Sequence, residues 1–274
     1  MPASYAHYTF GSHVLSQISD ISMKTLILEH HELFDIGLHG PDILFYYKPI
    51  TSNHVTKTGY GLHEKIAADF FTHARTIIRE MPIGSTDRES AMAYLFGFIC
   101  HFTLDSECHG YVDDMAKVLG VSHTKIESEF ERLLLEENHL NPILTQTTAH
   151  IATKDSYATC IAPFFEKTGV SDDITALEIT HALKSFKFYS NLLLAPHKWE
   201  RVLINIVLKL SGHYDFMHGL MISYKPEPRC HVTNEELSRR YHNAIAIAVQ
   251  LLTNYNQSLS TSTPLSNRFQ QDFK

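Results

Sequence analysis

Three side chains that are able to bind a metal recur at steps of four residues in the first half of the chain: His101, Asp105 and His109. A step of four residues turns an α-helix by only about forty degrees, so these side chains would share one narrow stripe of a helix. Imidazole nitrogens and carboxylate oxygens are ligands that zinc accepts, and bound zinc activates water for hydrolysis. The spacing therefore predicts a metal site on one helical face.

A second pair of the same kind follows shortly downstream, His123 and Glu127, again four residues apart. Two helices that each present such groups predict a site for more than one ion. The alternatives for the first three residues are hydrogen bonds between histidine and aspartate that stabilise a helix, or a polar stripe that faces solvent.

The helix that must carry the first three residues runs from Asp87 to about Tyr111 and has few charges, so its middle is expected to be buried. An unpaired aspartate there would cost several kcal/mol or stay protonated, and a bound cation removes that penalty. Ser122 is the expected N-cap of the next helix, which runs to about Asn138 before a break at Asn141 and Pro142.

Helical periodicity continues through the rest of the chain, and alternating runs typical of strands are scarce. Further helices are predicted at Gly61–Met81, Thr175–Leu194, Lys198–His213 and Asn234–Tyr255. The pattern predicts an all-α protein with a single multi-helix domain at residues 1–255. Residues 256–274 are rich in Ser, Thr, Asn and Gln, and are predicted to form a flexible polar tail outside the fold.

Composition narrows the class of protein. The formal net charge is −7 and no run is rich in Lys or Arg, so nucleic acid is not an expected partner. The first ten residues lack the features of a secretion signal, and no apolar stretch is long enough to span a bilayer. The four cysteines form no CxxC pair, which is typical of reduced thiols. We therefore expect a cytoplasmic location. Nineteen histidines are an excess that favours a metal site.

The segment Ala93–Asp105, with the sequence AYLFGFICHFTLD, resembles the zinc-binding core of the zinc-dependent phospholipase C family. The resemblance continues downstream through His109 and the pair His123 and Glu127. Its upstream part consists of His7, Gly40-Pro41-Asp42 and Gly59-Tyr60-Gly61-Leu62-His63-Glu64. Members of this family are all-α proteins that bind three zinc ions in one cleft, so the resemblance implies the same fold and two or three zinc ions here.

The resemblance also implies a role for each matching residue. One ion would be held by His63, His101 and Asp105, and a second by His109, His123 and Glu127. A third would lie between His7, Asp105 and the amino-terminal backbone. Asp42 would lie beside the first ion and is the candidate catalytic group, which would orient or deprotonate the attacking water. His54 is the alternative to His63, and His218 is a further candidate for lining the cleft.

The activity implied by the resemblance is hydrolysis of a phosphate ester by a metal-activated water. The substrate would be a small-molecule phosphodiester or a phospholipid. Two features depart from the family: secreted relatives begin with a tryptophan whose amine binds zinc, whereas this chain begins Met1-Pro2-Ala3, and the carboxyl-terminal β-sandwich of some members has no counterpart. The sequence also lacks the GxSxG motif and the Walker-type loop of other hydrolase classes.

Two other functions remain open at this stage. The pairs Glu136 with His139 and Glu178 with His181 are half-signatures of a di-iron helical bundle, which would make the protein an oxidoreductase. Alternatively, a zinc cluster without catalytic activity would stabilise a protein that binds a partner. Elemental analysis separates iron from zinc, and an activity assay separates the enzyme from the binding protein.

Overall fold

The computed structural model describes residues 4–212 and 214–274, and these residues form twelve α-helices, five short 3-10 helices and no β-strand. The prediction of an all-α protein is confirmed. The α-helices are α1 Ser4–Gln17, α2 Ile21–Glu29, α3 His31–Gly37, α4 His54–His63, α5 Ala67–Glu80, α6 Thr86–Leu119, α7 His123–Glu137, α8 Asp155–Ile161, α9 Ala176–Leu194, α10 Lys198–Leu210, α11 Tyr214–Met217 and α12 His231–Ser260. The 3-10 helices are η1 Gly40–Tyr46, η2 Ala162–Phe165, η3 His218–Leu220, η4 Pro228–Cys230 and η5 Asn267–Gln270. None of these helices has the length and apolar character needed to cross a membrane.

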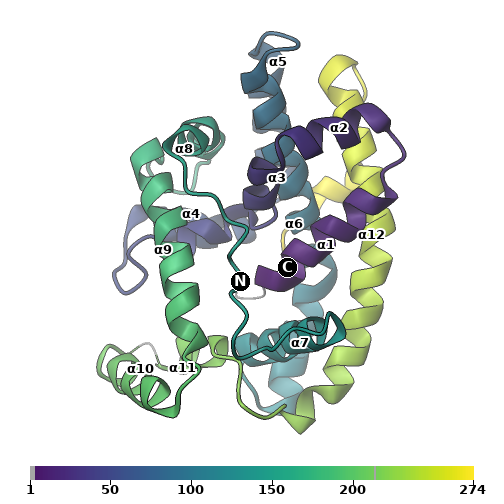
Figure 1. Ribbon diagram of the computed structural model, residues 1–274. Coiled ribbons are helices and arrows are strands. Elements are labelled where there is room, and N and C mark those ends of the chain that lie inside the picture. The colour runs from purple at the N-terminus through teal and green to yellow at the C-terminus, as the bar shows by residue number, and fades with distance from the viewer. Residues whose placement is uncertain (1–3, 213) are drawn as a thin grey trace.

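The long helix α6 is the centre of the fold and packs against α1, α3, α5, α7 and α12 (Figure 1). It begins after Ser85, whose hydroxyl accepts a hydrogen bond from the Arg88 amide at 3.3 Å. It ends at Gly120, which has a φ of +60° and caps the last turn by donating to the Ala116 carbonyl. The helix predicted from Asp87 to about Tyr111 therefore begins where expected, with its middle buried as predicted, and continues beyond Tyr111 to Leu119.

Two glycines allow α3 to lie directly against α6. A Cβ atom on Gly37 would overlap the backbone carbonyl of Tyr94, and one on Gly97 would overlap the carbonyl of Phe34. Because backbone atoms cannot move aside as side chains do, only glycine permits this approach. The contact holds the loop after α3, which leads into η1, close to the face of α6 that carries the predicted ligands.

The helix predicted from Gly61 to Met81 is wrong at its beginning, because the structure contains two helices there. Helix α4 ends at His63 and α5 begins at Ala67. In a continuous helix the Ala67 amide would donate to the His63 carbonyl. It donates instead to the carbonyl of Gln271, at 2.9 Å. The break also places Ile66 at the surface, with 48% of its area exposed.

The carboxyl-terminal segment packs into the main core. Helix α12 continues to Ser260, and Phe269 and Phe273 are then 0% and 1% exposed. The Phe269 ring lies against Phe71, with centroids 4.5 Å apart, and Figure 1 shows this end of the chain at the middle of the molecule. This packing differs from the flexible tail that the polar composition of residues 256–274 predicts.

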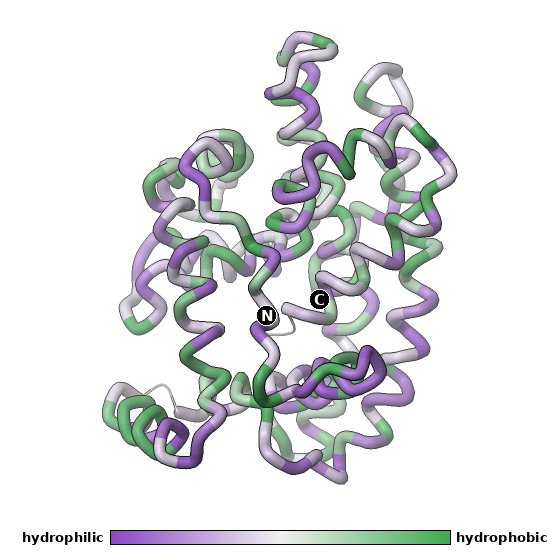
Figure 2. The backbone as a smooth tube through the Cα atoms, viewed as in Figure 1, coloured by the Kyte–Doolittle hydropathy of each residue, from purple (hydrophilic) through white to green (hydrophobic). Residues whose placement is uncertain are grey.

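Helices α9, α10 and α11 extend to one corner of the molecule (Figure 1). They have a small apolar cluster of their own, separate from the main core and formed by Leu193, Ala195, Leu208, Met217 and Met221. The predicted helix from Lys198 corresponds to α10, and its expected end at His213 lies outside the described residues. In Figure 2, α10 is coloured largely as hydrophobic although it lies at the edge of the molecule.

Candidate metal centre

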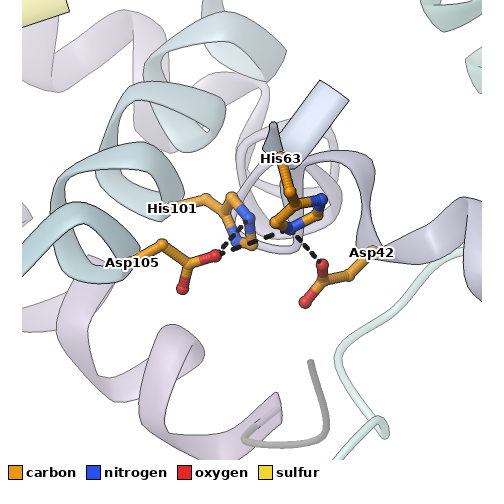
Figure 3. A group of neighbouring side chains, drawn as sticks. All are labelled: Asp42, His63, His101 and Asp105. Carbon is orange, nitrogen blue, oxygen red and sulfur yellow. Dashed lines mark ion pairs between the residues drawn. The ribbon is translucent and has the colours of Figure 1, made fainter. Parts of the chain in front are cut away.

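Four side chains from three elements converge beside α6: Asp42 from η1, His63 from the end of α4, and His101 and Asp105 from α6 (Figure 3). All four are buried, and one ligand atom of each lies within 4.8 Å of the others. His63 Nε2 is 3.0 Å from Asp42 Oδ1 and 3.7 Å from Asp105 Oδ2, and His101 Nε2 is 3.1 Å from Asp105 Oδ2. We call these four residues the first group.

The local sequence before Asp42 brings it to this position. Gly40 has a φ of +46°, a conformation that favours glycine, and a Cβ atom on it would overlap the His101 ring. Pro41 follows in the first turn of η1, where its fixed φ suits the start of a helix. The chain therefore passes directly against His101 and then turns the Asp42 carboxylate toward it.

His109, His123 and Glu127 form a second group on α6 and α7. His123 Nε2 is 2.9 Å from Glu127 Oε1, and His109 Nε2 is 3.7 Å from the same oxygen. His109 Nε2 also lies 3.5 Å from Asp105 Oδ1. The two carboxylate oxygens of Asp105 therefore face different groups, which places this residue between the two candidate sites.

Hydrogen bonds to Nδ1 fix the orientation of three of the four histidines in the two groups. Nδ1 of His63 donates to the Gly59 carbonyl at 2.8 Å, and Nδ1 of His109 donates to the Phe273 carbonyl at 2.7 Å. Nδ1 of His123 lies 2.6 Å from the Asp113 carboxylate. Since carbonyl and carboxylate oxygens only accept, the neutral ring keeps its hydrogen on Nδ1 and has a lone pair on Nε2. Histidines that bind a metal are oriented by such partners.

Several buried ligand atoms in these groups lack a hydrogen bond of good geometry within the part of the chain that the structure describes, although Nε2 of His63 and of His101 lies 3.0 and 3.1 Å from a carboxylate oxygen. They are His63 Nε2, His101 Nε2, Asp105 Oδ2 and Glu127 Oε2. Buried polar atoms are normally satisfied, and a divalent cation between nitrogen and carboxylate ligands would satisfy these. The mixture of imidazole and carboxylate without thiolate is a donor set that fits zinc. The residues therefore fit the metal that the resemblance implies.

The charges of the centre favour ionised carboxylates at Asp42 and Asp105 and protonated imidazoles at His63 and His123. Burial alone would raise the pKa of Asp105, but its electrostatic contacts with His101 and His109 and hydrogen bonds from His101 and His63 hold it well below its usual value. Burial would lower the pKa of His63, but hydrogen bonds to Asp105 and Asp42 raise it to about 9. For His123, burial is likewise outweighed by Glu127 and Asp113, and the pKa rises to about 9. A metal that binds at Nε2 has to displace these protons.

His7 lies beside the first group but belongs to neither. It is 2% exposed, its Nε2 is 3.2 Å from Asp105 Oδ1, and its ring stacks on His101 with centroids 4.5 Å apart. The structure thus brings His7 to Asp105, as predicted for a third ion. The amino-terminal backbone expected to complete that site falls in residues 1–3, outside the described residues.

The other candidate residues lie away from both groups. His54 begins α4 and pairs with Glu178 at 3.0 Å, so His63 is the histidine that joins the cluster. His218 is exposed and lies 3.1 Å from the Asn205 side chain. The residues proposed for a di-iron bundle do not converge at a buried site, because Glu136, His139 and His181 are exposed.

The sequence did not predict that three residues orient ligands: Gly59, Asp113 and Phe273. Asp113 had a detectable signal, because it continues the four-residue spacing of His101, Asp105 and His109. Phe273 had a weaker one, because it follows Phe269 by four residues in an otherwise polar segment. Gly59 contributes a backbone carbonyl, for which no side-chain pattern exists.

The fold and the two groups together are those of an all-helical protein with a candidate metal centre. The family model for zinc dependent phospholipase C matches residues 6–168, more than half of the chain and a range that contains both groups. The chain therefore belongs to the zinc-dependent phospholipase C family, which confirms the resemblance seen in the sequence. No curated protein and no solved structure matches the chain.

Proposed function

We propose that this protein is a zinc-dependent hydrolase that cleaves a phosphodiester, with a phospholipid or a related soluble ester as its substrate. The observation that carries the proposal is the position of Asp105. This residue of α6 lies between two groups of candidate ligands and contacts a histidine of each. Membership of a family described by zinc and phospholipase C supports the metal and the class of reaction.

Bound zinc ions lower the pKa of a water molecule and neutralise the phosphoryl oxygens on which charge develops. His63, His101 and Asp105 of the first group would hold one such ion, and the second group would hold another. Asp42 is the proposed catalytic residue, whose carboxylate orients the attacking water and accepts its proton. Burial raises the pKa of this carboxyl, but nearby positive charge and a hydrogen bond from His63 hold it below its usual value, so the group is ionised and able to accept.

The proposed reaction breaks one phosphorus–oxygen bond and forms another. The water oxygen attacks phosphorus, the bond from phosphorus to the alcohol oxygen breaks, and the proton taken by Asp42 is passed to the departing alcohol. No side chain needs to act as a nucleophile, in agreement with the absence of the GxSxG motif from the sequence.

The test compares Asp105→Asn with Asp114→Asn. Both changes convert one aspartate of α6 into its amide, but Asp105 is 1% exposed in the cluster and Asp114 is 79% exposed at the surface. Metal content is measured by mass spectrometry on freshly purified protein, and activity is measured on a panel of phosphodiesters and phospholipids. Asp105→Asn should lose bound zinc and all turnover, whereas Asp114→Asn should retain both.

Full activity of the Asp105→Asn variant would refute the assignment. Iron in place of zinc would favour the di-iron alternative. Zinc that raises the melting temperature without any hydrolysis across the panel would favour a binding protein stabilised by metal. The role of Asp42 is tested in the same assay, because Asp42→Asn should lower turnover by about 10²-fold or more while the second group still holds its ion.

A further inference from the structure

Helix α10 turns an apolar face toward solvent. Six large side chains on this face have between 49% and 84% of their area exposed, and we call them the α10 face: Trp199, Val202, Leu203, Ile206, Val207 and Leu210. They recur at steps of three and four residues, so they form one continuous stripe of the helix. Apolar patches of this kind on a protein surface mark interaction sites.

The α10 face is not needed to hold the helix in place. The opposite side of α10 packs inward through Leu208, which is 7% exposed in the small apolar cluster. Arg201 also points inward, donates to the carbonyls of Ala195 and Ile222 at 2.9 and 2.7 Å, and lies over the Tyr224 ring. One side of α10 therefore packs against the protein, and the opposite side is exposed to solvent.

The exposed charges on α10 itself are positive, although the chain as a whole carries −7. The exposed charged residues of α10 are Lys198 at its beginning and Lys209 at its end. The acidic residue of this helix, Glu200, is partly buried, and its carboxylate accepts the His197 amide at 2.9 Å. An apolar stripe with a lysine at each end is the pattern of a helix that lies in the plane of a membrane surface.

We infer that the α10 face docks onto a phospholipid surface that contains anionic lipid. The inference rests on the proposed function, since a substrate in a bilayer requires the enzyme to bind at the interface. A second copy of the chain fits the same face less well. Two α10 helices packed antiparallel around a two-fold axis would bring Lys198 of each copy near Lys209 of the other, where like charges repel.

The position of α10 relative to the metal centre agrees with this role. A small cavity of about 40 Å³ separates the end of α9 from the elements that carry ligands. One side is lined by Tyr46 of η1 and Glu131 of α7, each four residues after a residue of the centre, and the other by Leu193 and Leu220. The end of α9, which leads into α10, therefore lies near η1 and α7.

The test measures binding to vesicles separately from hydrolysis. The protein is mixed with sedimentable vesicles of phosphatidylcholine alone, or of phosphatidylcholine and phosphatidylglycerol in equal amounts, and the bound fraction is determined at low and high salt. The variant Leu203→Glu/Ile206→Glu is compared with Ile83→Glu, which places a glutamate on a 90% exposed isoleucine in the turn between α5 and α6. Circular dichroism and zinc content verify that each variant is folded.

The wild-type protein and Ile83→Glu should bind the mixed vesicles, and the double variant should bind at least about tenfold more weakly. Salt should weaken binding to the mixed vesicles, because the lysines contribute through charge. Equal binding by all three proteins, or none by the wild type, would overturn the inference, as would a wild-type dimer that the double variant dissociates. Binding through α10 without hydrolysis of any phosphodiester would refute the proposed function and leave the docking surface intact.

Discussion

The carboxyl-terminal segment makes two contributions to the metal centre that separate variants can distinguish. The Phe273 carbonyl accepts the Nδ1 hydrogen of His109, whereas its ring packs in the core, 5.1 Å from the Phe102 centroid and 5.5 Å from that of His63. Phe273→Ala removes the ring and keeps the carbonyl. A chain that ends at Asp272 removes both, while the hydrogen bond between Ala67 and Gln271 remains possible.

The two losses have different magnitudes and different readouts. Truncating a fully buried phenylalanine to alanine costs about 3–5 kcal/mol of folding free energy, so both variants should melt at a lower temperature than the wild type. Loss of a partner that orients a ligating histidine lowers metal affinity by about 10–100-fold, or about 1.4–2.7 kcal/mol. Only the shortened chain should show this loss, and only for the second group. The exposed pair between Lys274 and Glu64 is lost as well and contributes little.

Zinc affinity is measured by competition with a chelator, well below the melting temperature of both variants. Melting of the metal-free proteins gives the stability difference without a contribution from zinc. The reasoning fails if the shortened chain and Phe273→Ala bind zinc at the second group with the same affinity. It also fails if Phe273→Ala leaves the stability of the metal-free protein unchanged.

Two further predictions concern the packing of α6 and the protons of the centre. Gly97→Ala should destabilise the metal-free protein by about 1–3 kcal/mol in a urea titration, because the new Cβ atom would overlap the Phe34 carbonyl. The control is Gly110→Ala on the same helix, where a Cβ atom meets nothing within 4 Å. This variant should be neutral or slightly stabilising. Zinc affinity should rise with pH up to about 9, because the pKa of His63 and that of His123 are raised to about 9 in the metal-free protein and zinc must displace both protons. Each displaced proton makes apparent affinity about tenfold weaker per pH unit below that value, and chelator competition that gives the same affinity at about pH 6 and pH 8 would contradict this linkage.

Features set by local interactions could be predicted from the sequence. The buried helix that carries His101 and Asp105, and the N-cap at Ser122, both depend on residues within a few positions of each other. The side chains expected to bind metal do lie in two neighbouring groups, because a spacing of four on a helix determines their common face. Their function as ligands is still a prediction.

Features set by distant segments could not be predicted in this way. The helix break after His63 depends on the Ala67 amide, which donates to the carbonyl of Gln271, more than two hundred residues away in the chain. The polar composition after Tyr255 favoured a loose tail, whereas Phe269 and Phe273 are buried by contacts with Phe71 of α5 and Phe102 of α6, which no local pattern reveals. Similarly, the periodicity of α10 predicts an amphipathic helix but gives no indication that its apolar side faces outward.

The bond from His109 to Phe273 joins positions 164 residues apart. The seven side chains of the two groups all come from the first half of the chain, yet this histidine is held in place by the opposite terminus. A fragment that ends after α7 would contain all seven side chains but would lack the Phe273 carbonyl that orients His109. Tight binding of an ion at the second group would therefore require the carboxyl-terminal segment to be folded in place.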